Sequence, residues 1–138
     1  MSALVRFGVS LEAKLLSAFD RFIARKKYSN RSEAIRDLIR NELVEQEWGD
    51  NKETVGTITL VYDHHRADLQ EQLTEFQHQF TQLIIANTHV HLDHDHCLEV
   101  IIIRGKSSSI RNLAHLLIGT KGVIHGRLTT TTTGKMMT

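Results

Sequence analysis

The sequence predicts an α+β protein in which a small strand–helix–helix unit precedes a ferredoxin-like domain with the element order βαββαβ. Residues 1–48 change from strand-like alternation to two stretches with helical spacing. Residues 54–138 then show strand-like and helical segments in the order of a split βαβ sandwich. The polar stretch 49–53 between them is typical of a linker. We therefore expect one domain at 1–48 and a second at 54–138.

The first segment, Leu4–Ser10, alternates apolar and polar residues. Val5, Phe7 and Val9 fall on one face, which predicts a short strand with Ser10 as the N-cap of the helix that follows. A lone strand has an edge that needs a partner, and so few residues cannot bury a self-sufficient core. We therefore expect a two-fold dimer in which the strands of two chains pair.

Two helices follow this strand. Apolar residues recur at helical spacing over 11–23 and again over 35–43. Asn30, with Glu33 three residues later, predicts the start of the second helix in the manner of a capping box. The pattern predicts that this helix continues to about Trp48.

The C-terminal domain alternates between the periodicities of strands and helices. Its predicted segments are strands at 55–62, 87–92, 98–104 and 122–133 and helices at 68–86 and 107–119, the latter capped by Ser107, Ser108 or Ser109. This order supports the ferredoxin-like fold.

Composition narrows the class of protein. A net charge of +1 over 138 residues gives no indication of a polyanionic partner. Cys97 is the single cysteine, which excludes an intrachain disulfide and favours a reducing compartment. The sequence contains no signal-peptide pattern and no apolar run of membrane-spanning length. We therefore expect a cytoplasmic protein without a membrane partner.

Histidines cluster beside that cysteine in the segment THVHLDHDHC. His89 and His91 are two residues apart on a predicted strand, so both imidazoles project from one face. Cys97 follows six residues later and can return beside them after a turn. Two imidazoles and a thiolate are good ligands for a late divalent metal, and the sequence therefore predicts a metal site.

A fourth ligand is suggested by helix geometry. His78 lies nine residues after Leu69, so it points about 180° away from the apolar stripe of its helix. A histidine that faces outward can reach a site on another subunit. We therefore predict an intersubunit site with His89, His91 and Cys97 from one chain and His78 from its neighbour.

Other polar residues lie near this motif. Glu99 is placed to orient a ligand imidazole, as carboxylates often do in metal sites. His64 follows the first strand of the domain and is a candidate accessory group. His94 and His96 alternate with aspartates in the predicted turn and are expected to be solvated.

The motifs of common enzymes are missing from the sequence. It contains no HExxH, P-loop, GxSxG or GxGxxG pattern. Three or four protein ligands also leave little room for a substrate on the metal. We therefore expect a metal held for structure, for storage or as a signal, and no small organic substrate.

Two motifs carry a resemblance to a known family. NRSEAIRDLIR at Asn30–Arg40, after an alternating strand, resembles a ribbon-helix-helix DNA-binding domain. THVH at 88–91 and CLEV at 97–100 resemble the NikR family of nickel-responsive transcriptional regulators. The resemblance implies a cytoplasmic repressor of nickel homeostasis. It also implies a homotetramer, in which two ribbon-helix-helix dimers flank a core of ferredoxin-like (ACT-like) domains.

The resemblance also assigns the metal and its ligands. It implies Ni²⁺ bound in a square-planar site by His89, His91 and Cys97, with His78 supplied across a core interface. The ligand types alone suit copper or zinc nearly as well. A ribbon-helix-helix regulator that senses one of those metals, an antitoxin-like repressor with a structural metal, and a metal-storage protein remain alternatives.

Double-stranded operator DNA is the partner that the resemblance implies. In ribbon-helix-helix proteins the paired strands enter the major groove, and the matching positions here are Arg6, Gly8 and Ser10. Arg6 suits guanine O6 and N7, whereas Gly8 stands where the family often has a hydroxyl.

Further residues of the second helix are expected near the DNA. Phosphate contacts are expected from the backbone at Asn30, Arg31 and Ser32 and from the side chain of Arg36. Glu33 and Asp37 lie one turn apart, and in the family this pair belongs to a secondary cation site. Glu33 is read equally well as the capping-box acid alone.

Overall fold

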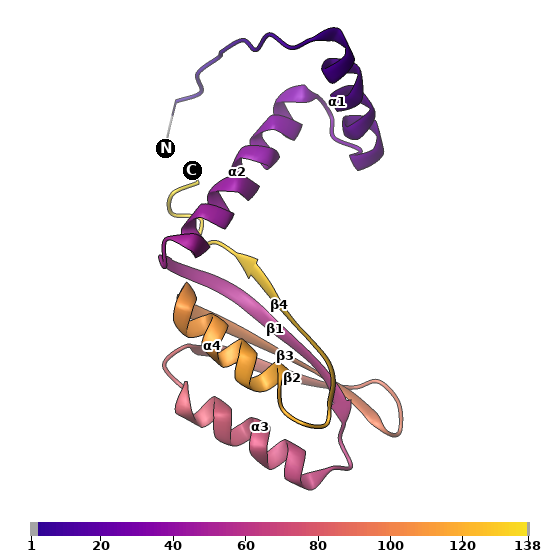
Figure 1. The fold of residues 1–138 in the computed structure, drawn as a ribbon, viewed down its shortest axis with the longest axis vertical. Helices are drawn as coiled ribbons and strands as arrows, with labels where there is room; N and C mark the ends of the chain where they lie inside the picture. Colours follow the sequence, from indigo (N-terminus) through magenta and orange to yellow (C-terminus); the bar gives the residue numbers. More distant parts are fainter. Residues whose placement is uncertain (1–2, 138) are drawn as a thin grey trace. The chain divides into compact units, whose positions relative to one another are not determined.

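The computed structural model describes residues 3–137 (Figure 1). By its internal contacts the chain forms two compact units. One holds the N-terminal part up to Leu43 together with the residues from Gly134 onward, and the other is Val44–Thr133. No helix among the described residues is long and apolar enough to span a membrane.

The N-terminal unit contains helix α1 (Ala13–Lys26) and most of helix α2 (Arg31–Gly49). Within residues 3–137, the segment before α1 forms no strand, because a strand requires a partner that one chain does not supply. The side chains of Val5 and Phe7 are 85% and 72% exposed. The prediction of Ser10 as the helix cap was wrong, since α1 begins at Ala13.

The start of α2 matches the prediction. The Oδ1 atom of Asn30 accepts a hydrogen bond of 2.9 Å from the backbone N–H of Glu33, as an N-cap residue does. The carboxylate of Glu33 pairs with Nη2 of Arg36 at 2.8 Å. Asn30 therefore caps the helix, and the side chain of Glu33 forms an i,i+3 ion pair with Arg36.

The C-terminal unit is a four-stranded antiparallel sheet covered by two helices. Its elements are β1 (Glu53–Asp63), α3 (Ala67–Gln79), β2 (Ile84–His91), β3 (His96–Lys106), α4 (Ser107–Ile118) and β4 (Val123–Thr131). The strand order is β2-β3-β1-β4, and all three pairings are antiparallel. Figure 1 shows both helices on the same side of the sheet. The ferredoxin-like βαββαβ prediction is confirmed.

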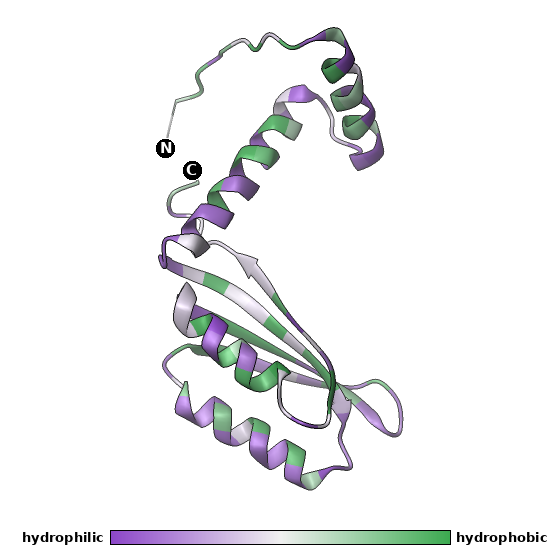
Figure 2. Cartoon of the chain, in the orientation of Figure 1, coloured by the Kyte–Doolittle hydropathy of each residue, from purple (hydrophilic) through white to green (hydrophobic). Residues whose placement is uncertain are grey.

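Alternate residues of the central strands build the core. Ile58 and Leu60 of β1 and Ile101 and Ile103 of β3 are fully buried. The helices contribute their apolar stripes to the same cluster, with Leu69, Leu73, Ile110, Leu113 and Leu117. Figure 2 shows α3 and α4 as alternating hydrophobic and hydrophilic residues, as expected of helices with one face on a core.

The predicted helix at 68–86 was too long. Helix α3 ends at Gln79, and Phe80 has a non-helical backbone with φ −126° and ψ 30°. Strand β2 begins at Ile84, which pairs with Ile103 of β3. Sheet pairing therefore decides the structure of residues whose apolar spacing also fits a helix.

Residues 50–52 form an ordered turn between α2 and β1, within the stretch that was expected to be a linker. Trp48 is buried, and its Nε1–H donates to the carbonyl of Thr131 at 2.8 Å. The hydroxyl of Ser107 donates to the carbonyl of Trp48 at 2.7 Å. The Oδ1 atom of Asn51 accepts the backbone N–H of Ser108 at 2.9 Å. Asn51 therefore caps α4, in place of the serines predicted from the sequence.

Candidate metal centre

Strand pairing at the edge of the sheet places three of the four predicted ligand side chains on one face. In the β2–β3 register His91 lies opposite Cys97, and His89 lies opposite Glu99. Opposed residues of antiparallel strands project to the same side of the sheet. Cys97 and Glu99 are buried on the face that the helices cover, so His89 and His91 stand on that face at its open edge.

Glu99 is the centre of a buried hydrogen-bond network. The hydroxyl of Tyr62 donates to its Oε1 atom at 2.7 Å, and the Nε2 of His89 lies 3.3 Å from the same oxygen. Gln77 donates to Oε2 at 2.9 Å, and Asn87 donates to the same atom. Burial, and then the hydrogen bond to Glu99, hold the pKa of Tyr62 far above its usual range, so Tyr62 stays a donor. The predicted role of Glu99 beside a ligand imidazole fits this geometry.

The thiol of Cys97 is buried beside the same network. Burial raises the pKa of Cys97, the hydroxyl of Tyr62 lowers it, and the carboxylates of Glu99 and Asp63 raise it further. Without a cation the thiol is therefore the favoured form at neutral pH. A metal that binds Sγ must displace this proton, because the thiolate is the ligand.

His78 lies on the exposed side of α3, as its spacing from the apolar stripe predicts. It lines a surface groove together with Tyr62, His89 and Glu99 of the same chain. Its imidazole is thus accessible from outside the subunit. The ligation of a metal by a partner's His78 stays a prediction.

The donor set fits a late divalent cation, although the four groups are not gathered around one point in the single chain. Among residues 3–137, only His65, His94 and Asp95 form a group of three metal-ligating side chains with all donor atoms within 4.8 Å. The ring centroid of His91 lies 4.6 Å from that of His64, whose Nδ1 is buried and has no hydrogen-bond partner. Imidazole nitrogens and a thiolate are the donors that such a cation prefers.

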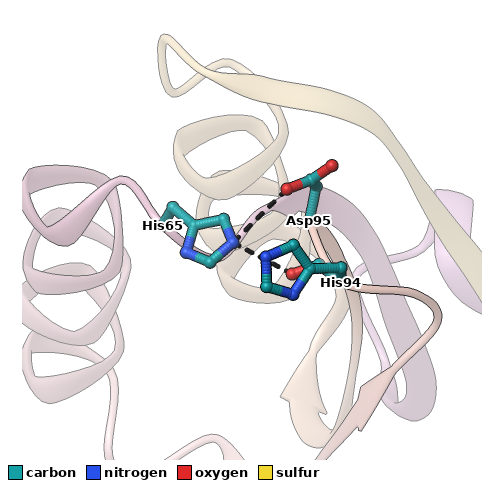
Figure 3. A group of neighbouring side chains, drawn as sticks. All are labelled: His65, His94 and Asp95. Atoms are coloured by element: carbon teal, nitrogen blue, oxygen red, sulfur yellow. Dashed lines mark hydrogen bonds and ion pairs between the residues drawn. The ribbon is translucent and has the colours of Figure 1, made fainter.

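His94 and His96 are both open to solvent, as the sequence analysis expected, and each also contacts a neighbouring side chain. The Nδ1 of His96 lies 3.0 Å from both carboxylate oxygens of Asp93. The hydrogen bond from His96 lowers the pKa of Asp93 to about 2, and Asp93 raises the pKa of His96. The ring of His94 lies against that of His65, with centroids 5.1 Å apart (Figure 3).

The predicted base-reading residues Arg6, Gly8 and Ser10 are exposed in the extended segment before α1. No Cβ contact within 4 Å restricts Gly8. All three residues are therefore open to solvent among the residues that the structure describes.

The predicted phosphate-binding cations are engaged within the chain. Arg31 donates from Nε and Nη2 to the carboxylate of Asp20 at 3.0 and 2.9 Å. Arg36 pairs with Glu33, and Ser32 is exposed. The backbone start of α2 stays accessible, whereas the Arg31 side chain would have to leave Asp20 to reach a phosphate.

The carboxylate of Asp37 is also engaged. Its Oδ2 accepts a hydrogen bond of 2.6 Å from the hydroxyl of Tyr28. This bond raises the pKa of Tyr28. A cation shared by Glu33 and Asp37 would have to compete with Arg36 and Tyr28.

The sequence analysis missed Tyr62, Gln77 and Asn87 as partners of Glu99. They come from β1, α3 and β2, and no spacing rule relates residues of three different elements. Tyr62 carries a partial signal, since a tyrosine at an inward position of a buried strand needs a hydrogen-bond partner.

Two family models match the chain. "NikR C terminal nickel binding domain" matches residues 55–131, and "Ribbon-helix-helix protein, copG family" matches residues 5–46. The curated relatives include three that carry the name "Putative nickel-responsive regulator". The one from Nitratidesulfovibrio vulgaris (strain DP4) is 55% identical and covers 100% of both chains. The one from Solibacter usitatus is 56% identical over 99% of both, and the one from Geobacter sulfurreducens 56% over 98% of both.

The matches agree with the two-part architecture. The ribbon-helix-helix model ends within α2, and the nickel-binding model runs from β1 to β4 of the sheet. One family model spans more than half of the chain, and the relatives align with nearly all of it. The chain therefore belongs to the NikR family of ribbon-helix-helix, nickel-responsive regulators.

Proposed function

We propose that this chain is a nickel-dependent, sequence-specific DNA-binding repressor that controls nickel homeostasis in the cytoplasm. The observation that carries the proposal is the register of β2 and β3, which places His89, His91 and Cys97 on one face of the sheet edge. Membership of the NikR family indicates that the metal is nickel, because the ligand types alone do not distinguish nickel from copper or zinc. The protein is then a transcription regulator rather than an enzyme.

The metal site is proposed to join two subunits. His89, His91 and Cys97 of one chain hold Ni²⁺ together with the partner's His78. The bound ion supplies a rigid cross-link between the subunits. Glu99 holds the His89 imidazole in place through its Oε1 atom, and His64 lies against His91 as an accessory group. A shared site lets the metal bias the quaternary arrangement, because a ligand shifts an equilibrium by its differential affinity for two states.

The DNA-binding unit is proposed to act as a dimer, and the whole protein as a homotetramer. Val5, Phe7 and Val9 are mostly exposed in the single chain, and pairing with a second copy would bury them. The opposite face of the paired strands then presents Arg6, Gly8 and Ser10 to the major groove. We assign residues 1–48 to this domain and 54–138 to metal binding and tetramerisation, joined by a linker at 49–53.

Phosphate contacts are proposed at the start of α2. Helix N-termini bind phosphate through free backbone N–H groups, which Asn30, Arg31 and Ser32 provide here. Arg36 adds a cation once it is released from Glu33. The Glu33–Asp37 pair is proposed as a secondary cation site, which requires both carboxylates to change partners.

DNA affinity measured with and without nickel tests this function. At fixed salt, one equivalent of Ni²⁺ per chain is expected to tighten binding to the operator and to leave binding to unrelated DNA unchanged. Salt is held constant because it alone changes such affinities by orders of magnitude. If Zn²⁺ or Cu²⁺ tightened operator binding as much as Ni²⁺ does, the protein would not be specific for nickel as its signal. DNA affinity that ignores every metal would overturn the regulatory role.

A further inference from the structure

Two loops meet at the end of the sheet and bring three metal-ligating side chains together. His65 follows β1, while His94 and Asp95 lie in the turn between β2 and β3. Their donor atoms all lie within 4.8 Å of one another. Figure 3 shows the side chains of His65 and Asp95 directed toward each other with the His94 ring beside them.

The backbone holds these loops in register without a cation. The N–H of His64 donates to the carbonyl of Asp95 at 3.1 Å and so ties the two loops together. The Oδ1 of Asp93 accepts the N–H of Asp95 at 2.8 Å, and Oδ1 of Asp63 accepts the N–H of His65 at 2.9 Å. The two loops are therefore already ordered, so a cation would bind without an additional entropy loss from ordering them.

We propose that His65, His94 and Asp95 form a second divalent-metal site, separate from the Cys97 centre. Two imidazole nitrogens and one carboxylate oxygen suit Zn²⁺, Co²⁺ or Ni²⁺. All three residues are exposed, so water completes the coordination sphere. The site has no sulfur ligand.

Polar atoms already converge on the His65 ring. Its Nε2 lies 2.9 Å from the carbonyl oxygen of His94 and 3.4 Å from Oδ1 of Asp95. A cation bound at Nε2 takes the place of the ring proton that these oxygens now attract. The carboxylate of Asp63, at the end of β1, accepts the N–H of His65 and adds negative charge that favours a cation.

The second site is adjacent to the proposed nickel centre but shares no ligand with it. The ring of His64 lies between them, with its centroid 4.2 Å from that of His65 and 4.6 Å from that of His91. The second site draws its donors from one chain and needs no partner subunit. It therefore does not depend on the proposed function.

Zinc titration of the nickel-loaded protein tests the site. The full chain is first given one equivalent of Ni²⁺ and then titrated with ZnCl₂ by calorimetry, with X-ray absorption at the zinc edge. We expect one further zinc ion per chain, with nitrogen and oxygen ligands and no sulfur at about 2.3 Å. His65→Asn, His94→Asn and Asp95→Asn should each weaken this zinc by about tenfold or more.

His125→Asn is the matched control, because His125 is an exposed histidine on β4. It should leave the second zinc unchanged, and circular dichroism should show all four variants folded. Zinc binding that survives the three ligand variants, a zinc–sulfur distance, or no further zinc at all would overturn the proposal. If the unmodified, nickel-loaded protein showed no nickel–thiolate absorption band, this would count against the proposed nickel centre. The zinc result would be unaffected.

Discussion

Tyr62 and Glu99 form a buried hydrogen bond of 2.7 Å between neighbouring strands, and the same Glu99 oxygen lies 3.3 Å from the imidazole of His89. Glu99 is 2% exposed, whereas the His89 side chain is 41% exposed. The carboxylate is thus anchored in the core and reaches out to a proposed ligand at the surface. We therefore propose that Glu99 positions His89 for the proposed metal centre.

Glu99→Gln should weaken nickel binding by about 10–100-fold, the usual effect of losing a carboxylate that orients a ligand imidazole. The amide keeps the size of the side chain, but its charge is gone and one end becomes a donor. Nickel competition with a chelator measures the affinity. Glu71→Gln, in the same groove on α3, is the control and should bind nickel normally. Equal affinity of both variants would show that Glu99 does not act on His89.

Nickel binding should release protons and strengthen as pH rises through neutrality. The pKa of Cys97 is raised, chiefly by burial, so the thiol is protonated at neutral pH and must lose about one proton to the metal. Nickel affinity should therefore keep rising with pH beyond the usual pKa of a cysteine thiol. Calorimetry in buffers of different ionisation enthalpy counts the protons.

Cys97→Ser should abolish the sulfur-to-metal charge-transfer band of the nickel complex and flatten its pH dependence. Serine keeps the shape of the side chain, but its hydroxyl is a harder ligand that does not ionise in this range. Visible absorption spectra of the two proteins give the comparison. A band that survives the substitution would mean that Cys97 is not a ligand.

Arg6→Ala should remove part of the preference for operator DNA, at a cost of about 1–3 kcal/mol for a lost bidentate contact to guanine. Binding to unrelated DNA should change much less, and nickel affinity should be unchanged. Fluorescence anisotropy at fixed salt measures both DNA affinities. Arg127→Ala, an exposed arginine on β4, is the control. A parallel loss of nickel affinity in Arg6→Ala would contradict the separation of the two domains.

A mixture of His78→Ala and His89→Ala should recover nickel sites that neither variant has alone. A chain with an intact His78 can complete the His89, His91 and Cys97 set of its neighbour. The two variants are unfolded, refolded together and titrated with nickel, and mass spectrometry checks that subunits have mixed. Mixed oligomers without recovered sites would place all four ligands in one chain.

Asn51→Ala should lower the free energy of unfolding by about 0.5–2 kcal/mol, the usual effect of removing a helix cap. The causes are the loss of the acceptor for the N–H of Ser108 at the start of α4 and the positive φ of 55° at Asn51, which asparagine tolerates better than alanine. Denaturant unfolding measures the change. Asp50→Ala, the exposed neighbour in the same turn, should change stability little. Similar losses in both variants would assign the effect to the turn and not to the cap.

Local patterns determined much of this protein. The alternation of β1 and β3, the stripe of α4 and the cap at Asn30 are set by neighbours in sequence, and each could be predicted. The His-Val-His spacing likewise places two imidazoles on one face of any strand. The sequence alone therefore predicted the element order of the C-terminal unit, and it suggested the residues of the proposed metal centre.

Only the tertiary structure decided which distant groups meet. Helix α3 ends where it does because Ile84 pairs with Ile103 of β3. The cap of α4 is Asn51, which lies far from α4 in the sequence. The network around Glu99 and the group of His65, His94 and Asp95 join residues of separate elements. Such contacts follow from strand register and loop packing, which depend on the whole core. A pattern within one segment carries no information about them.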